Sequence, residues 1–419
     1  MAATPKHVLD RRPAAAPVYE PSLRSIELIP ATPRPTHVRY HHLDVLRGLM
    51  MVLGVVLHGS LIYSTRAVWI ISDADRAPIF DALYRMIHSF RMPAFFMIAG
   101  FLCVPSLHKG VNAFLRDRSR RLILPLVATA LLLNSLQVLL VWGVDGFWNA
   151  YSSGRWVSHL WFLLDLIVFT VAAAGVWSLV PRLTQWKPPL LFGGAVMLVL
   201  PLASAAIRAA CDRGLVPPGK YLGILNLTEL FYYMPFFLYG MLERPGEDPE
   251  RLRKLSVWSM LVLIAITVVP TYRLPGERLY YNAALAWCLS ILCIQVGVLC
   301  MNRPIGFLRS LADASYTIFL FHQLIVVALG LALMHTSLPL GLKFATVVGV
   351  AFSLSLAIHV FVIRRSAWLS LMFNGRVLRP AVKPQGPARE LSGSDTVHNL
   401  KRPSSEPTVV MRKPGRVPK

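Results

Sequence analysis

The sequence predicts an all-α fold, a polytopic bundle of about ten transmembrane helices with both termini in the cytoplasm. The first observation is composition, because 55% of the 419 residues are hydrophobic and only 15% are charged, unlike an average soluble protein. The second is the recurrence of apolar windows close to the length of about 20 residues that one bilayer crossing needs. The third is a concentration of Lys and Arg in alternate connecting segments.

Ten apolar windows mark the expected membrane helices. They fall at 43–63, 84–104, 122–142, 158–180, 189–208, 228–243, 256–272, 282–301, 313–334 and 338–363. The sixth and seventh windows are short, so tilted or broken helices are expected there. We find no internal repeat, and an inverted-repeat transporter therefore has no support from the sequence.

Basic residues set the expected orientation of the helices. Lys and Arg are concentrated in the segments 105–121, 181–188, 244–255 and 302–312, and in both chain ends. The positive-inside rule places these segments and both ends in the cytoplasm. The net charge of +22 is then explained by topology control and contact with anionic lipid, and no nucleic-acid partner is expected.

Three regions follow from composition. Residues 1–38 contain seven prolines and no apolar core, which predicts a disordered, basic cytoplasmic tail. Residues 39–375 form the transmembrane domain, and residues 376–419, rich in Pro, Arg and Ser, predict a second disordered basic tail. The five cysteines show no C-x-x-C spacing and four of them lie in apolar windows, so neither a disulfide nor a metal site is predicted.

The first window carries three ionisable residues, Asp44, Arg47 and His58. Asp44 and Arg47 are three residues apart and can pair on a helix. Arg47 and His58 are eleven residues apart, so at about 100° per residue they share one helix face, roughly 16 Å apart along the axis. Ionisable groups at such depths usually face a bundle interior or a wet cavity. The structural alternative is an arginine that snorkels to the surface and a packed, hydrogen-bonded histidine.

The second window places His88 and Arg91 at a depth similar to that of His58, counting from the outer membrane surface. Pro93 is expected to kink this helix or to open its backbone at the same level. The matching depths favour a shared cavity over the alternative in which Arg91 snorkels outward.

Four arginines, Arg116, Arg118, Arg120 and Arg121, directly precede the third window. Topology alone explains most basic inner segments. Arginine forks also match the geometry of phosphate, so the functional interpretation is a binding site for a cytosolic, phosphorylated donor.

Two further ionisable residues lie inside later windows. Asp165 is roughly 10 Å deep in the fourth window, where a carboxylate needs a cation or a hydrogen-bond donor. Arg91 and His58 are expected at the right depth to supply one. His322 lies in the middle of the ninth window, where a structural hydrogen bond and a chemical role explain it equally well.

Aromatic and acidic residues stand at the outer membrane boundary, namely Trp161, Glu229 and Tyr232. Aromatic residues are ordinary there, as an interfacial belt. Together with a carboxylate they also suit a sugar-binding platform, because pyranose faces stack on aromatic rings. The motifs of soluble hydrolases, P-loop proteins, zinc proteases and dinucleotide-binding enzymes are absent from the sequence, so any enzymatic chemistry is expected within the membrane.

Ordered motifs across several windows resemble a known family. They are Arg47-x10-His58 after Leu43-Asp44, Ile87-His-Ser-Phe-Arg-Met92 followed by Phe95-Phe-Met-Ile-Ala-Gly-Phe101, Arg118-x-x-Arg121 followed by Pro125, Ser158-His-Leu-Trp-Phe-Leu-Leu164, Phe231-Tyr-Tyr-Met-Pro-Phe-Phe237 and Tyr316-Thr-Ile-Phe-Leu-Phe-His322. Over about residues 40–365 the chain resembles the integral-membrane acyltransferase family 3, and within it the group associated with succinylation of osmoregulated periplasmic glucans. The family's usual Ser-Gly is Ala99-Gly100 here, a mild departure.

The resemblance implies a multi-pass acyltransferase of the bacterial inner membrane. Its co-substrate would be a cytoplasmic acyl-CoA, succinyl-CoA or acetyl-CoA, with no permanently bound cofactor. Its acceptor would be a hydroxyl of periplasmic glucan or another polysaccharide outside the membrane. In this hypothesis Arg47, Arg118 and Arg121 bind the phosphates of CoA, whose pantetheine arm is comparable in length to the rise from Arg47 to His58.

The same resemblance suggests roles near the outer surface. His58 would act as general base on the acceptor hydroxyl, since a neutral imidazole suits that task. Asp165 would orient the His58 ring. Arg91, with His88 beside it, would bind a succinyl carboxylate or stabilise the developing oxyanion.

Two other functions stay open at this point. The first is an O-acetyltransferase that modifies lipopolysaccharide or another exported polysaccharide, because no residue fixes the acyl group. The second is a proton-coupled transporter in which Arg47, Arg91 and His58 line the substrate path. The four arginines before the third window argue against a transporter, because a transporter needs no phosphate site on one side. A purely structural membrane protein would not need so many intramembrane ionisable groups.

Overall fold

The computed structural model describes residues 41–179, 193–217, 219–221, 224–243, 249–268, 277–301 and 306–376. The regular secondary structure of the described residues is helical except for one short antiparallel ribbon, β1 (Lys220–Tyr221) paired with β2 (Leu225–Asn226), which confirms the predicted all-α class. The chain separates into a unit that ends at Val377 and a second unit, Leu378–Lys419. The two predicted tails lie outside the described residues, apart from Arg376 at the start of the second.

Twelve α-helices follow one another along the described part of the chain. They are α1 (His41–Ile62), α2 (Pro78–Leu107), α3 (Val111–Ala128), α4 (Ser135–Ser152), α5 (Trp161–Leu179), α6 (Gly193–Asp212), α7 (Leu227–Glu243), α8 (Pro249–Val268), α9 (Glu277–Cys300), α10 (Gly306–Leu333), α11 (Leu340–Ala357) and α12 (Ala367–Asn374). A π-helical segment, Thr129–Asn134, joins α3 to α4, another, Ile358–Val362, follows α11, and a short 3-10 turn, Ser158–Leu160, leads into α5.

Eight helical stretches in the described part of the chain are long and apolar enough to cross a membrane. This supports a multi-pass membrane protein, although ten spans were predicted. The sixth and seventh predicted windows correspond to α7 and α8. Helix α7 has only 17 residues, and α8 opens with the charged sequence Pro-Glu-Arg-Leu-Arg-Lys. These are the two windows in which short or irregular helices were expected.

The third predicted window is part of a longer helical path, Val111–Ser152, of 42 residues. That path exceeds one bilayer crossing of about 20 residues. It bends at Gly143, whose φ of 67° lies in the left-handed region that glycine tolerates. The predicted boundary at residue 142 is therefore a kink, and the segment 144–152, predicted as loop, is helical. The exposed Trp148 on this segment is a residue type that favours a membrane–water boundary.

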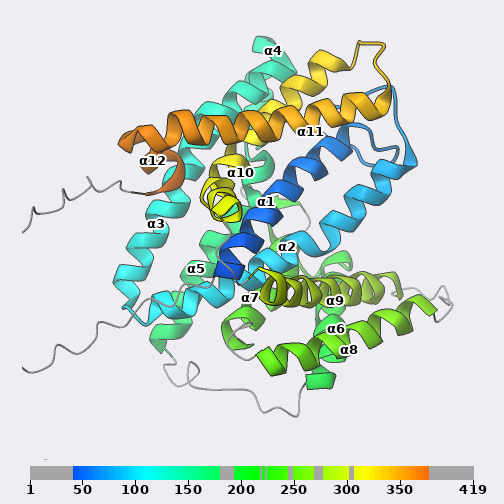
Figure 1. Cartoon of the computed structure of the whole chain (residues 1–419), viewed down its shortest axis with the longest axis vertical. Coiled ribbons are helices and arrows are strands. Elements are labelled where there is room, and N and C mark those ends of the chain that lie inside the picture. Colours follow the sequence, from blue (N-terminus) through cyan, green and yellow to red (C-terminus); the bar gives the residue numbers. More distant parts are fainter. Residues whose placement is uncertain are drawn as a thin grey trace, which may run out of the picture. The chain divides into compact units, whose positions relative to one another are not determined.

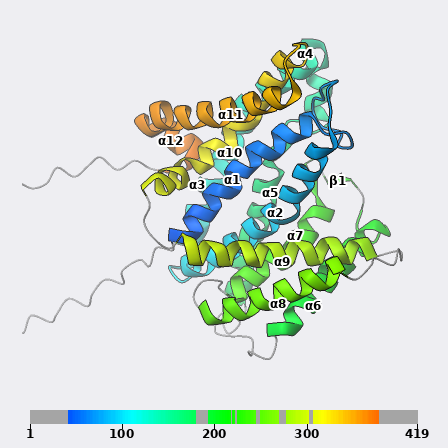
Figure 2. The ribbon, with the colours of Figure 1, turned by 45° about the vertical axis from the view of Figure 1, so that its right-hand side comes forward.

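Helix α1 lies between α2 and α10 and also touches α9 and α11 (Figure 1). Helices α6, α8 and α9 pack together and reach α2 through α9 and α7 (Figure 2). Helix α12 packs on α3. His58 thus faces neighbouring helices, whereas Arg47 and Asp44 near the other end of α1 keep 37% and 31% of their side-chain surface exposed.

Helices α2 and α7 touch through their backbones. A Cβ atom built on Gly240 would lie 1.9 Å from the carbonyl oxygen of Met97, and one on Gly100 would lie 2.0 Å from the carbonyl oxygen of Phe237. Only glycine fits at such a crossing, where membrane helices gain their packing from close approach rather than from a hydrophobic driving force.

The close crossing predicts a large cost for one methyl group. Gly240→Ala should push α7 away from α2 and lower the free energy of unfolding by about 1–3 kcal/mol, the usual range for an overpacked contact. Thermal unfolding of the detergent-purified protein, followed by size-exclusion chromatography, measures the effect. Gly175→Ala in α5 is the control, because no atom lies within 4 Å of the added Cβ. Equal melting temperatures for the two variants would contradict the prediction.

Candidate active site

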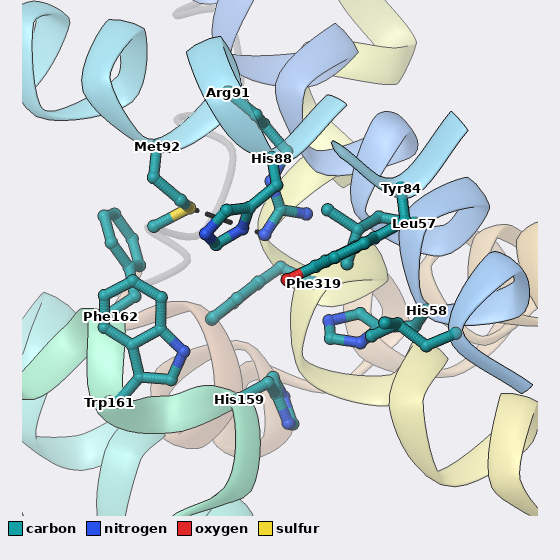
Figure 3. A pocket seen from close by; sticks show the side chains of 11 residues that line it. Leu57, His58, Tyr84, His88, Arg91, Met92, His159, Trp161, Phe162 and Phe319 are labelled. Carbon is teal, nitrogen blue, oxygen red and sulfur yellow. Dashed lines mark hydrogen bonds between the residues drawn. The ribbon is translucent and has the colours of Figure 1, made fainter. Parts of the chain in front are cut away.

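A cavity of about 170 Å³ opens among α1, α2, α5 and α10 (Figure 3). It is smaller than the roughly 300–1,000 Å³ pockets that enclose drug-sized ligands, so it suits a small group rather than a whole oligosaccharide. It is lined by Leu57, His58, Leu61, Tyr84, His88, Arg91, Met92, His159, Trp161, Phe162 and Phe319. Four of the candidate residues chosen from the sequence, His58, His88, Arg91 and Trp161, therefore share one space.

His58 projects from α1 into this cavity between two aromatic neighbours. Its ring stacks on Trp69 with 5.4 Å between ring centroids, and the ring of His322 lies 5.2 Å away. Its Nδ1 atom is buried without a hydrogen-bond partner. His58 is therefore surrounded by aromatic rings, and its buried Nδ1 atom makes no hydrogen bond in this conformation.

Trp69 reaches His58 from the segment 63–77, which joins α1 to α2. The carboxylate of Asp81 accepts hydrogen bonds from the hydroxyls of Ser64 and Thr65 and from the backbone N–H of Thr65, at 3.1 Å. At the other end of the segment, Lys343 Nζ on α11 lies 3.3 Å from Asp73 Oδ2. The segment is thus fixed at both ends. Trp69 was not among the residues chosen from the sequence. The available signal was Lys343, a lone lysine near the beginning of the 338–363 window, because a buried lysine needs an acidic partner. That partner, Asp73, lies on the same segment as Trp69.

Arg91 extends from α2 toward α1. A Cβ built on Gly54 would lie 2.3 Å from Arg91 Nη1, so glycine leaves the room that the guanidinium occupies. Arg91 Nη2 donates to Met92 Sδ at 3.4 Å, a weak acceptor, and Nε has no partner. Within the described residues no carboxylate pairs with Arg91. A buried guanidinium in this state can bind a carboxylate or an oxyanion from a substrate.

Pro93 lies inside α2, two residues after Arg91. Proline supplies no N–H to the preceding turn, so the carbonyl oxygen of Ser89, four residues earlier, loses its helical partner. Ser290 on α9 donates its hydroxyl to the next carbonyl oxygen, that of Phe90, at 3.4 Å. This bond ties α9 to the turn that carries Arg91, and it does not replace the bond that Pro93 removes.

The arginines chosen as a donor site gather at the far end of α1. Arg47 interacts electrostatically with Arg118, Arg121 and Arg376. The Tyr316 hydroxyl on α10 donates to the carbonyl oxygen of Arg121 at 2.7 Å and connects α3 to the same region. We call Arg47, Arg118, Arg121 and Arg376 the arginine cluster. Sequence reasoning missed Arg376, because its position depends on how α12 packs on α3.

Acidic residues neutralise the arginine cluster only in part. Asp44 lies 4.0 Å from Arg47, Asp117 lies 3.1 Å from Arg121, and Asp313 lies 3.3 Å from Arg376. These carboxylates are 31–46% exposed, so the pairs are weak and easily exchanged. Arg118 instead lies over the ring of Phe114 and beside the sulfur of Cys103. The cluster can therefore accept a polyanion.

The cavity and the arginine cluster lie on the same side of α1. Arg47 sits over the ring of Phe95 on α2, and Gly54 and His58 follow it at seven and eleven residues, facing α2 and α10. The cavity lining does not include Arg47, Arg118 or Arg121. Phe95 is 5% exposed and packs beneath Arg47. A molecule that extends from the cluster to His58 therefore requires side-chain movement along this path.

Asp165 lies outside the cavity lining. Its side chain is 2% exposed, its Oδ2 atom has no hydrogen-bond partner, and the structure shows no hydrogen bond or ion pair between it and His58. Asp165 interacts electrostatically with Glu229 and Tyr233, both on α7. The predicted pairing with His58 or Arg91 was based on equal depth, and depth does not fix the direction in which a residue points from its helix. Its role in orienting His58 therefore stays a prediction without a supporting contact.

The other two acceptor candidates, Glu229 and Tyr232, belong to α7 rather than to the cavity lining. They are connected to it through aromatic rings, because Tyr232 contacts Tyr233 edge-on at 5.2 Å and Tyr233 stacks on Trp161 at 5.8 Å. Glu229 Oε1 pairs with Arg208 Nη1 at 3.4 Å. An aromatic row with an ion pair at its end thus leads away from the cavity.

Most of the chain is similar in sequence to known proteins. The sequence profile of the family Acyl_transf_3, described as an acyltransferase domain, matches residues 40–363. The chain is similar to Glucans biosynthesis protein C of Salmonella gallinarum and of Salmonella paratyphi B, with 25% identity over 386 residues in each case. Each alignment covers 84% of this chain and 97% of the relative. No solved structure matches the chain.

The fixed segment beside His58 predicts an asymmetric effect of two substitutions. Lys343→Met should lower the melting temperature by several degrees, because it leaves Asp73, 1% exposed, buried without a cation. Asp75→Asn is the control, since Asp75 pairs with the same lysine at 2.9 Å but is 58% exposed and should change stability little. Thermal unfolding in detergent compares the two. A Lys343→Met protein as stable as the Asp75→Asn protein would be inconsistent with this role.

Proposed function

We infer the function of this chain from its family, because the chain belongs to acyltransferase family 3 and its candidate membrane spans fit a membrane-bound acyltransferase. We propose that it transfers a succinyl group from cytoplasmic succinyl-CoA to hydroxyls of a periplasmic glucan, in the inner membrane of a bacterium. The similarity to Glucans biosynthesis protein C supports the acceptor class and the location.

One observation carries the proposal. A single helix, α1, presents Arg47 to the three other residues of the arginine cluster at one end and His58 to a cavity at the other. The two residues are eleven positions apart, which corresponds to roughly 16 Å along the axis. A CoA whose phosphates lie on the arginine cluster would therefore bring its thioester toward His58, once the side chains around Phe95 make room.

The proposed reaction uses His58 as general base. The imidazole takes the proton of a glucan hydroxyl while the hydroxyl oxygen attacks the thioester carbonyl carbon. The tetrahedral intermediate carries a negative oxygen, for which the Arg91 guanidinium is a donor in the same cavity. When the C–S bond breaks, the CoA thiolate takes the proton back from His58, and an ester and free CoA remain. No acyl-enzyme is needed.

The acyl group is the less constrained part of the proposal. Arg91 lies in the cavity without a carboxylate partner among the described residues. A dicarboxylic acyl group would supply that partner through its free carboxylate, which favours succinyl over acetyl. His88 lines the same cavity and stands one helical turn before Arg91, where it can hydrogen-bond the same group.

The acceptor is proposed to approach along the aromatic row. Trp161 lines the cavity and Tyr233 stacks on it, while Tyr232 and Glu229 continue the row along α7. Sugar rings stack on such surfaces, and the carboxylate of Glu229 can accept hydrogen bonds from hydroxyls. The cavity of about 170 Å³ then holds only the reacting hydroxyl and the acyl group.

A second candidate keeps the chemistry and changes the substrates. If Arg91 serves only the oxyanion, acetyl-CoA would fit as donor, and lipopolysaccharide or another exported polysaccharide would be an alternative acceptor. A proton-coupled transporter is disfavoured, because the arginine cluster and the family relationship both point to a CoA-dependent transferase.

The proposed function predicts that substitutions at the two sites affect different steps, succinyl-CoA binding at the arginine cluster and succinyl transfer at His58. In detergent-purified protein, His58→Ala should abolish succinyl transfer and retain succinyl-CoA binding, whereas Arg118→Ala/Arg121→Ala should weaken that binding at least tenfold, by removing two phosphate partners. Calorimetry and mass spectrometry of the glucan measure the two steps. Arg116→Ala/Arg120→Ala, at two exposed positions of the same helix outside the cluster, is the charge-matched control.

Mass spectrometry of periplasmic glucans from a deletion strain tests the substrates directly. Loss of succinyl groups supports the proposal, and unchanged glucans favour the polysaccharide O-acetyltransferase. A wild-type protein that binds neither succinyl-CoA nor acetyl-CoA, or a His58→Ala protein that succinylates at the normal rate, would overturn the mechanism.

Arg91 predicts donor selectivity. Replacement by glutamine removes the charge but leaves hydrogen-bond donors, so Arg91→Gln should lower kcat/KM for succinyl-CoA about tenfold or more relative to acetyl-CoA. Competition between the two donors, read out by mass spectrometry of the product, gives the ratio directly. An unchanged ratio with both rates reduced would assign Arg91 to the oxyanion alone.

A further inference from the structure

Four buried ring nitrogens on three neighbouring histidines have no hydrogen-bond partner. They are Nδ1 of His58 on α1, Nε2 of His322 on α10 and both ring nitrogens of His159 in the turn before α5. The rings of His58 and His322 lie 5.2 Å apart between centroids and are tilted by 41°. His322 is 1% exposed. Because buried polar atoms are nearly always hydrogen-bonded, two unsatisfied nitrogens on adjacent rings point to an interaction between them that this conformation does not complete.

The backbone fixes which nitrogen of His322 carries the proton. Nδ1 lies 2.9 Å from the carbonyl oxygen of Ile318 and 2.8 Å from that of Phe319. Carbonyl oxygens only accept hydrogen bonds, so Nδ1 of His322 must be the donor. In the neutral ring Nε2 is then left with its lone pair. His322 therefore offers an acceptor, buried beside His58.

The charged surroundings explain why a neutral acceptor suits this position. Arg91 from α2 and His159 from the turn before α5 act electrostatically on both rings, and neither is acidic. A Cβ on Gly54 would lie 3.8 Å from His322 Nε2 and 2.3 Å from Arg91 Nη1, so both groups converge one helical turn before His58. A carboxylate placed here would pair with Arg91 and withdraw it from the substrate. A neutral imidazole lone pair is a weaker acceptor for the guanidinium and leaves its charge uncompensated.

We propose that His322 is a positioning residue for His58, an inference that rests on the proposed function. Nε2 of His322 accepts a hydrogen bond from the Nδ1–H of His58, directly after a small ring rotation or through one water molecule. This bond selects the tautomer of His58 whose Nε2 lone pair is free for the acceptor hydroxyl. The proton taken from that hydroxyl sits on Nε2 of His58 and later passes to the CoA thiolate, while Nδ1 keeps its own proton throughout.

The inference assigns to an imidazole the part that Asp165 was expected to play. It also explains why His322 is fixed so firmly, since two carbonyl oxygens of its own helix set both its tautomer and its direction. His159 lies 5.6 Å from His322 between ring centroids, and its own two ring nitrogens are also buried without a partner. Of the two histidines next to His322, only His58 has been assigned a proton to move.

Steady-state kinetics of the full-length, detergent-purified protein with succinyl-CoA and glucan tests the proposal. His322→Leu removes the acceptor and should lower kcat about 100-fold, while KM for succinyl-CoA stays within about twofold. His322→Gln can place its amide oxygen where Nε2 was and should recover a substantial part of kcat. His359→Leu is the control, because His359 is also buried against α10, through a 2.8 Å contact of Nδ1 with Thr317 Oγ1, but is remote from the cavity.

The outcomes separate the inference from the function on which it rests. A kcat unchanged in His322→Leu overturns the inference and leaves the proposed function intact. The inference is also overturned if His322→Leu and His322→Gln are equally slow and both raise KM and lower stability, as His359→Leu does. A packing role for His322 explains that pattern. A wild-type protein that neither binds succinyl-CoA nor transfers an acyl group overturns the proposed function and this inference together.

Discussion

The enclosure of one polar stripe is the constraint on which the structure depends. Arg47 and His58 lie on the same face of α1, and neither can face lipid without a large cost. Helices α2 and α10 cover that face, with glycines at positions 48 and 54 that let α10 and the Arg91 side chain come close. Burial of the stripe in turn creates the small aromatic cavity, since rings rather than carboxylates surround His58.

The composition and helical periodicity of the sequence predict part of this architecture. Composition gives the all-helical membrane class, and the eleven-residue spacing gives the shared face of Arg47 and His58, because both depend on local geometry alone. The shared cavity of His58, His88 and Arg91 follows from equal depth. Contacts set by tertiary packing could not be predicted from the sequence. Trp69 lies on a connecting segment, Arg376 is placed by α12, and Asp165 lies outside the cavity lining because depth does not fix the direction in which a residue points from its helix.

The two ends of the stripe are chemically different sites. One is an open cluster of arginines whose exposed acidic partners are easily exchanged, and the other is a small cavity with an unpaired guanidinium. Phe95, packed beneath Arg47, occupies the path between them. Such a barrier would keep the two aqueous sides of a membrane separate when no donor is present, and it makes donor entry dependent on the rotamers of a few side chains.

The glycine crossing of α2 and α7 has a mechanical consequence. Two helices in backbone contact cannot slide past each other without collision between carbonyl oxygens and α-carbons, so they move as one body. That body carries Arg91 on α2 and the tyrosines of the aromatic row on α7. Arg91 and the tyrosines of the aromatic row thus keep a fixed spacing, and relative movement within the cavity is left to α1 and α10, which carry His58 and His322.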